Sequence, residues 1–154
     1  MITVTKQAAK RVDIVRVQMV RDSSLLYPQR TVRMAKDVVE LFLRFLAESD
    51  REQFILLCLN TKNQPTAIHT VSIGSLDASI VHPREVFKVA ILANASSIIV
   101  GHNHPSGDPT PSREDINVTH SLKQVGELIG IPVLDHVIVG TEGAFWSMKE
   151  KGDM

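Results

Sequence analysis

The sequence has one cysteine, few aromatic residues and no long apolar run. Aromatic residues make up 5% of its 154 residues, although 44% are hydrophobic and 22% are charged. A single cysteine excludes an intramolecular disulfide, and Cys58 lies within the apolar run 54–59, so we expect a buried, inert thiol. Because no run approaches about 18 apolar residues and no apolar h-region begins the chain, we expect neither a membrane span nor a signal peptide. A cytoplasmic location is the default expectation.

Net charge is also lacking, although the charges are unevenly distributed. The chain has 17 Lys or Arg and 17 Asp or Glu. Residues 1–33 hold seven basic and two acidic residues, a balance of +5, so the remainder carries −5. A basic segment of this kind can attract nucleic acid but is more often a solvated edge. Since Tyr27 is its single aromatic residue, it offers no base-stacking platform, and we expect weak DNA binding at most.

Hydrophobic periodicity predicts one α/β domain, with a mixed β-sheet flanked by about three helices. The length suits a single domain and is too short for the roughly 250 residues of a (β/α)₈ barrel. Alternation from Val15 onward predicts a half-buried edge strand at 12–20, so residues 1–30 form a strand and connector ahead of a domain at 31–154. The pattern of residues 74–81 is ambiguous and fits a bulged strand extension. The other expected elements are helices at about 31–48, 82–94 and 112–129, and strands at 53–59, 66–73, 97–101, 133–139 and 144–148.

A polar segment, 101–115, directly follows the apolar run 97–100 and predicts a metal site. If the backbone stays extended this far, the period of two puts His102 and His104 on one side. The next helical pattern begins so that Asp115 falls in its first turn. Two imidazoles and one carboxylate suit zinc with a fourth position left for water, which is the arrangement of catalytic sites. On spacing alone, a surface turn with locally hydrogen-bonded histidines remains the alternative.

A motif of the form His-x-His, seven residues and Ser-x-x-Asp occurs at His102, His104, Ser112 and Asp115. This motif resembles the JAMM motif of JAB/MPN metallohydrolases. The surrounding text, Gly-His-Asn-His-Pro-Ser-Gly-Asp-Pro-x-Pro-Ser, is similar to the RadC branch in particular. The similarity runs over about residues 52–152 and includes the segments 81–85, 94–95 and 134–136. The resemblance implies a mixed sheet of the cytidine-deaminase-like kind, with zinc held by the two histidines and the aspartate.

The resemblance also implies roles for residues that are not metal ligands. In JAMM enzymes the proton acceptor is a glutamate near the start of an upstream strand, and Glu52 matches that position. The Ser112 hydroxyl would donate to the oxyanion in addition to capping the third helix. Glu85 is the rival carboxylate, but its place in the first turn of a helix indicates a structural role. Asp135 and His136 belong to the RadC-type pattern and could orient a ligand side chain, the alternative being a packed core histidine.

Together these residues predict a zinc-dependent hydrolase that cleaves an amide or isopeptide bond in a peptide or protein substrate. Zinc would activate the attacking water, with Glu52 as general base. The rival is a non-catalytic module, either DNA-repair-associated or a scaffold, that retains a structural metal. The basic segment at the N-terminus is the feature in its favour. The sequence leaves the identity of the substrate and the oligomeric state open.

Overall fold

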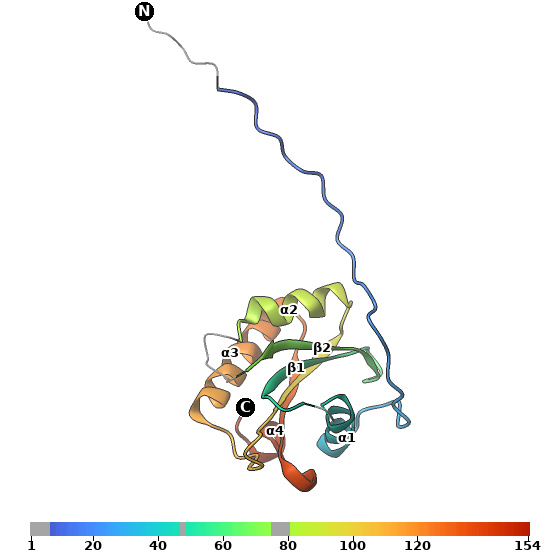
Figure 1. Cartoon of the computed structure of the whole chain (residues 1–154), viewed down its shortest axis with the longest axis vertical. Helices are drawn as coiled ribbons and strands as arrows, with labels where there is room; N and C mark the ends of the chain where they lie inside the picture. Colours follow the sequence, from blue (N-terminus) through green and yellow to red (C-terminus); the bar gives the residue numbers. More distant parts are fainter. Residues whose placement is uncertain (1–6, 47–48, 75–80) are drawn as a thin grey trace, which may run out of the picture.

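A mixed five-stranded β-sheet is the central layer of the protein, and its strand order is β2-β1-β3-β4-β5 (Figure 1). The computed structural model describes residues 7–46, 49–74 and 81–154. β3 and β4 are parallel, whereas the other neighbouring pairs are antiparallel. This arrangement confirms the predicted α/β class with a mixed sheet. The strands are β1 (Gln53–Leu59), β2 (Pro65–Ile73), β3 (Ser97–Asn103), β4 (Val133–Val139) and β5 (Phe145–Ser147).

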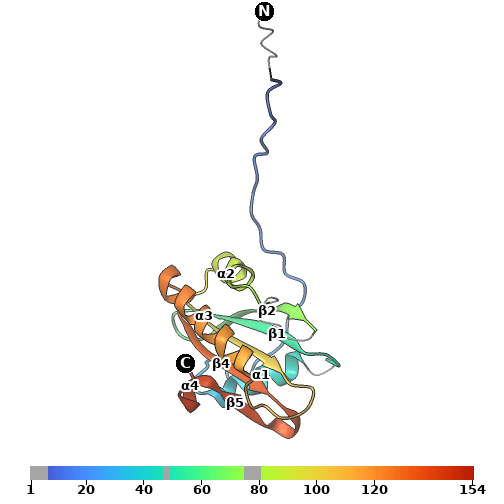
Figure 2. The ribbon, with the colours of Figure 1, turned by 90° about the vertical axis from the view of Figure 1, so that its left-hand side faces the viewer.

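Helices cover both faces of the sheet, which explains why its central strands are continuously apolar. α1 packs on one face, where it contacts Leu57 of β1 and Ile99 of β3. α2 and α3 pack on the other face, against Leu56 and Val100, and α4 lies beside β4 and β5 (Figure 2). About three helices are predicted, and the short α4 is the additional one. The helices are α1 (Ala35–Phe45), α2 (Pro83–Leu92), α3 (Arg113–Ile129) and α4 (Met148–Lys151).

None of the helices within the described ranges has the length and apolar character that a membrane crossing needs.

The helix α3 begins where the sequence predicts because Ser112 and Asp115 satisfy each other's hydrogen-bonding groups. The Asp115 N–H donates to Ser112 Oγ at 3.1 Å, and the Ser112 N–H donates to Asp115 Oδ2 at 2.8 Å. This reciprocal arrangement is a capping box. At the other end Gly130 has a φ of +84°, a left-handed conformation that glycine adopts without a steric penalty. The capping box holds the Asp115 side chain against the start of the helix.

The antiparallel pairing of β1 with β3 brings the start of β1 to the end of β3. In this register Phe54 lies opposite His102. Glu52, which immediately precedes β1, is therefore next to the segment that leaves β3 towards His104. Residues far apart in the sequence thus meet at one end of the sheet, beside the N-terminus of α3.

Residues 12–20 do not form the predicted edge strand. The segment 7–26 contains no helix or strand, and its side chains are exposed to solvent. Figures 1 and 2 show this segment running away from the sheet and its helices. The alternating pattern is present in the sequence, but a strand requires a hydrogen-bonded neighbour, and none of the described strands pairs with this segment.

Other predicted boundaries differ from the structure or lie where it is not described. α1 begins at Ala35 rather than at residue 31, because the Asp37 carboxylate accepts from the N–H groups of Arg33 and Met34 and so ends the preceding turn. β3 extends beyond residue 101 to Asn103, which places His102 inside the strand. The predicted end of the first helix at 48 and most of the ambiguous stretch 74–81 lie outside the described residues.

Gly101 occupies a position in β3 that has no room for a side chain. A Cβ atom there would overlap the Phe42 ring of α1 and lie 2.7 Å from the Val137 carbonyl oxygen of β4. Gly101→Ala is therefore expected to lower the free energy of unfolding by about 1–3 kcal/mol, as is usual for an overpacked core. Denaturant unfolding measures this change, and an unaltered midpoint would contradict the close packing of α1 on β3.

Candidate metal centre

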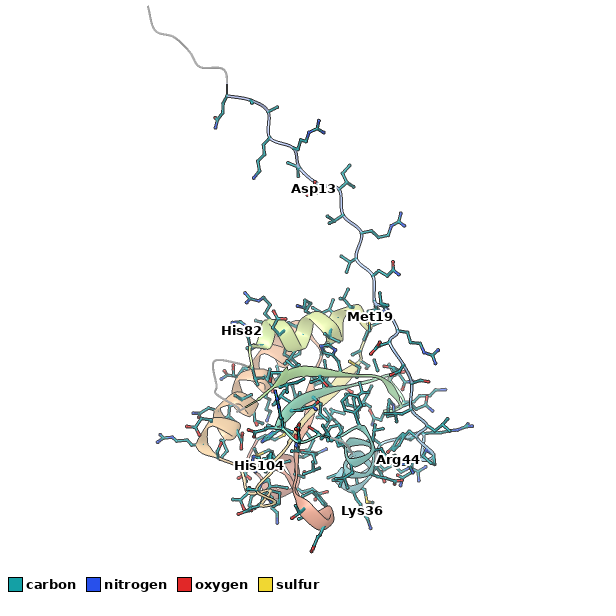
Figure 3. The ribbon with its side chains drawn as sticks, viewed as in Figure 1. Asp13, Met19, Lys36, Arg44, His82 and His104 are labelled. Carbon is teal, nitrogen blue, oxygen red and sulfur yellow. The ribbon has the colours of Figure 1, made fainter. Side chains whose placement is uncertain are left out.

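Glu52, His102 and His104 place ligand atoms within 4.8 Å of one another, and as a group they can hold a metal ion. They come from the start of β1 and the end of β3, where Figure 3 labels His104. The two histidines approach most closely, with 2.9 Å between their Nε2 atoms. Glu52 Oε1 lies 3.8 Å from His104 Nε2. Both imidazoles therefore lie on one side of the extended segment, as the period of two predicts.

The Asp115 carboxylate lies against both imidazoles from the first turn of α3. Its Oδ1 is 3.3 Å from His102 Nε2, and its Oδ2 is 3.4 Å from His104 Nε2. Burial raises the pKa of this carboxyl, but hydrogen bonds with both histidines and with the Ser112 N–H outweigh burial and hold the pKa far below its usual range. The hydrogen bond with Asp115 in turn raises the pKa of His104, against the desolvation that lowers it. Asp115 therefore presents a full negative charge to the two rings at neutral pH.

A chain of buried hydrogen bonds determines which nitrogen of His102 carries the proton. The Thr119 hydroxyl donates to the Asp115 backbone carbonyl at 2.6 Å, so its oxygen accepts from Nδ1–H of His136 at 2.6 Å. Burial lowers the pKa of His136 well below its usual value, so this ring is neutral and its Nε2 has a lone pair. His136 Nε2 accordingly accepts from His102 Nδ1–H at 2.8 Å. The lone pair of neutral His102 is therefore on Nε2, which faces the site.

His104 is oriented in the same sense by a backbone carbonyl. Its Nδ1 lies 2.7 Å from the carbonyl oxygen of Asp108, which can only accept a hydrogen bond. The Nε2 atom of neutral His104 therefore also carries a lone pair. With both rings neutral, two Nε2 lone pairs lie 2.9 Å apart beside the Asp115 carboxylate, an arrangement that a shared cation stabilises. The donors fit a divalent metal ion, for which a proton can substitute in the metal-free protein.

The site is dry on one side and open on the other. His102 is fully buried and stacks on Phe54, with ring centroids 6.0 Å apart and an interplanar angle of 17°. The side chains of His104 and Glu52 are 16% and 20% exposed. Charges act more strongly on the buried side because the local dielectric constant is lower there. The solvent-accessible side of the site is the side of His104 and Glu52.

Asn103 points away from the histidines and ties the backbone around Glu52 to β3. The Gln53 N–H donates to Asn103 Oδ1 at 2.7 Å, and Asn103 Nδ2 donates to the Arg51 carbonyl at 2.9 Å. The Glu52 carbonyl also accepts from the Gly74 N–H at 2.8 Å. These three hydrogen bonds hold the backbone from which the Glu52 side chain extends towards His104.

Ser112 and Glu85 are the other two candidate catalytic side chains. Ser112 lies beside the metal-binding cluster, whereas Glu85 lies on α2. Ser112 is exposed at the N-terminus of α3, and its Oγ accepts from the Asp115 N–H, so its own O–H can donate to another group. Glu85 lies on α2 with its Oε2 2.6 Å from Lys88 Nζ, and the hydrogen bond to Lys88 lowers the pKa of this exposed carboxyl. Glu85 therefore forms an ion pair on a helix surface.

Asp135 and His136 are neighbours in β4 but point to opposite sides of the strand. His136 reaches His102, whereas the Asp135 carboxylate accepts from Ser147 Oγ at 2.6 Å and from the Lys149 N–H at 3.1 Å. Burial raises the pKa of Asp135, although these hydrogen bonds oppose the increase. The contacts of Asp135 join β4 to β5 and α4, while those of His136 join β4 to the histidine cluster.

Three residues contribute to this arrangement without having been identified from the sequence. Asp108 acts through its backbone carbonyl, which no side-chain pattern reveals. Asn103 is adjacent to both histidines, but its partners lie at the start of β1 and become apparent through strand pairing. Thr119 is the one with a usable signal, because it lies four residues after Asp115 and residues at i and i+4 share a helix face.

Comparison with known proteins gives a consistent family assignment. The family model described as "RadC-like JAB domain" matches residues 32–153. The chain is 57% identical over 121 residues to a UPF0758 protein of Desulforamulus reducens, an overlap that covers 79% of this chain and 53% of the relative. It is 55% identical over 125 residues to one of Methanosarcina barkeri (81% and 54%), and 58% identical over 123 residues to one of Halalkalibacterium halodurans (80% and 53%).

The chain spans about half the length of the curated relatives that it matches. The matched residues nevertheless include all five described strands and the three histidines that lie together, His102, His104 and His136. The chain therefore belongs to the RadC-like JAB domain family.

Proposed function

We propose that this domain is a zinc-dependent hydrolase that cleaves an amide or isopeptide bond in a peptide or protein. The proposal rests on the convergence of two imidazole lone pairs and the buried Asp115 carboxylate, with a second carboxylate, Glu52, at the open side. His102, His104 and Asp115 would hold the zinc, because three such ligands leave a fourth position open. A bound zinc ion lowers the pKa of water to about 7 and polarises a carbonyl oxygen.

Glu52 is proposed as the general base rather than as the third ligand. Its Oε1 is 3.8 Å from His104 Nε2, whereas the Asp115 oxygens are 3.3 and 3.4 Å from the two Nε2 atoms. The Glu52 side chain is 20% exposed, compared with 4% for Asp115, so it borders the space that a substrate enters. A general base must lie within hydrogen-bond reach of the proton it takes, and the position of Glu52 at this border supports the assignment.

The proposed reaction consumes one water and moves its proton through Glu52. The water oxygen bonds to the carbonyl carbon of the substrate while the Glu52 carboxylate takes a proton from that water. Glu52 then gives the proton to the leaving nitrogen as the C–N bond breaks, which yields an acid and an amine. Meanwhile the Ser112 hydroxyl donates to the carbonyl oxygen as it becomes negative, since Ser112 Oγ already accepts from a backbone N–H.

Zinc-loaded protein incubated with internally quenched peptides and with isopeptide-linked conjugates tests this proposal. We expect cleavage of at least one substrate class that stops when a chelator removes the zinc and resumes when zinc is restored. Cleavage that continues at full rate in metal-free protein would contradict the assignment.

A non-catalytic module is the second candidate function, and the exposed basic segment ahead of the domain is the observation that favours it. In such a module a protein side chain would complete the coordination of the metal. Glu52 is the residue placed for that role, because its carboxylate lies within 4.8 Å of both histidine nitrogens. A zinc-loaded crystal structure separates the candidates: a water in the fourth position supports the hydrolase, and a direct bond from Glu52 supports the module.

We also propose that Thr119 and His136 are positioning residues, because they hold the His102 lone pair towards the metal. Thr119→Val keeps the side-chain shape and removes the hydroxyl, so His136 loses the partner that selects its tautomer. Zinc affinity is expected to fall about 10–100-fold, as is typical when groups behind a metal ligand are changed. Competition with a chromophoric chelator measures the loss. Thr66→Val, the same change on the exposed surface of β2, is the matched control, and equal affinities in both variants would contradict the role.

A further inference from the structure

The segment 12–20 has the alternation of a β-strand but pairs with none of the strands in the described part of the chain. Val15, Val17 and Met19 alternate with polar residues, and the two valines are 79% and 68% exposed. Figure 3 shows Asp13 far out on this segment and Met19 beside the end of α2. An isolated strand is not stable in water, so this segment needs the edge of a sheet if it is to form a strand.

The outer edge of β2 also lacks a neighbour among the described strands. β2 stands first in the strand order and pairs with β1 on its inner side. It contains no Lys, Arg, Asp or Glu, the charged residues that commonly protect an exposed edge, and its one proline, Pro65, stands at its first position. Half-buried apolar side chains lie on both of its faces, with Ile68 towards α1 and with Ala67 and Val71 towards α2. The edge therefore offers backbone N–H and C=O groups for pairing, with apolar side chains on both faces against which an added strand can pack.

A groove of about 1010 Å³ runs along this edge. Residues 65–70 of β2 line one side, and the protein's own residues 19–25 line another. The latter segment borders the groove without pairing with β2. Since neighbouring strands lie about 4.8 Å apart, a strand that enters the groove can bond directly to the β2 backbone.

We propose that residues 12–20 of one copy of this chain add as a strand to the outer edge of β2 in a second copy, and that the second copy returns the same contact. The segment and β2 are each nine residues long. Strand addition satisfies the edge backbone groups and covers the apolar residues of the segment. Reciprocal exchange closes a two-fold dimer and leaves neither edge open.

Charge supports the exchange between copies. Residues 1–33 carry +5 and the rest of the chain carries −5, so the basic N-terminal part of one copy is attracted to the body of the other, although residues 12–20 themselves hold one Arg and one Asp. Pairing with the chain's own β2 is less favourable, because residues 19–25 already border that groove and the chain then runs away from it (Figures 1 and 2).

The mass in solution tests the proposal. Light scattering after size exclusion is expected to give twice the 17.1 kDa of one chain, with dissociation on dilution. Arg16→Pro combined with Val17→Pro removes two successive N–H donors, so one is lost whichever side of the segment faces β2. This variant is expected to dissociate about 100-fold more readily. Ala8→Pro with Ala9→Pro, just ahead of the segment, is the matched control that alters no charge and should leave the dimer intact. Both variants should keep the parent's melting temperature at concentrations where the parent is monomeric, since the changes lie outside the core.

Hydrogen exchange identifies the contact itself. Amides of residues 12–20 and 65–73 are expected to gain protection together, and at concentrations where the dimer forms. A monomeric mass at all concentrations would overturn the proposal, whether or not these amides are protected. A dimer that the Arg16→Pro and Val17→Pro changes do not weaken would overturn it as well. Protection of residues 12–20 that requires added DNA would overturn it too, in favour of a nucleic-acid contact.

Discussion

Glu52→Gln is expected to reduce hydrolysis by about 10²–10⁴-fold, or about 3 to 5 kcal/mol of barrier, while zinc content and folding stay nearly unchanged. The glutamine keeps the size of the side chain but cannot take the proton of the attacking water. Zinc binding should persist because the proposed ligands are His102, His104 and Asp115. Cleavage rates at saturating substrate, together with elemental analysis of zinc, measure the two quantities on one sample.

Glu85→Gln is the matched control, since this carboxylate lies on α2 and pairs with Lys88. Its effect should stay within about half a kcal/mol, as for other surface substitutions. Asn103→Ala should lie between the two, with a lowered kcat and retained zinc, because it frees the backbone on both sides of Glu52. A Glu52→Gln variant that cleaves as fast as the parent would remove the general base from the mechanism.

His104→Ala and His102→Ala are each expected to remove most of the bound zinc, because a site with one imidazole fewer loses a protein ligand. The two variants should differ in stability. His104 is partly exposed at the end of β3, so its loss should leave the fold intact. His102 is fully buried, and its removal leaves His136 Nε2 without its donor, which should lower the free energy of unfolding by about 1–3 kcal/mol.

Elemental analysis and denaturant unfolding check these two expectations separately. His120→Ala serves as control, because His120 is exposed on α3 and bonds to the Asp153 carbonyl rather than to the cluster. Zinc contents equal to those of the parent in both cluster variants would show that the metal is held elsewhere. Equal stabilities of the two variants would contradict the buried hydrogen-bond chain behind His102.

Local patterns account for most of the fold that could be predicted. β1 can be predicted from its continuous apolar run, which reflects the burial of both of its faces. The start of α2 can be predicted from Pro83, because proline is favoured at the first position of a helix. The helix predicted at about 31–48 begins earlier than α1 does, because the Asp37 side chain caps the N–H groups of Arg33 and Met34 and so competes with continuation of the helix. The strand at 12–20 was predicted from alternation, which reports the propensity of a segment but not whether an edge is available to it.

Sequence spacing predicts the part of the site that lies within residues 102–115. A period of two sets the two histidines on one side, and the capping box sets Asp115 at the start of α3; both depend on near neighbours in the chain. The tertiary structure alone decided that Asn103 ties down the backbone of Glu52 and that Thr119 orients His102 through His136. These contacts depend on strand order, on the register of β1 against β3 and on the packing of α3 against β4. Local periodicity does not encode them, because it carries no information about which distant segments become neighbours.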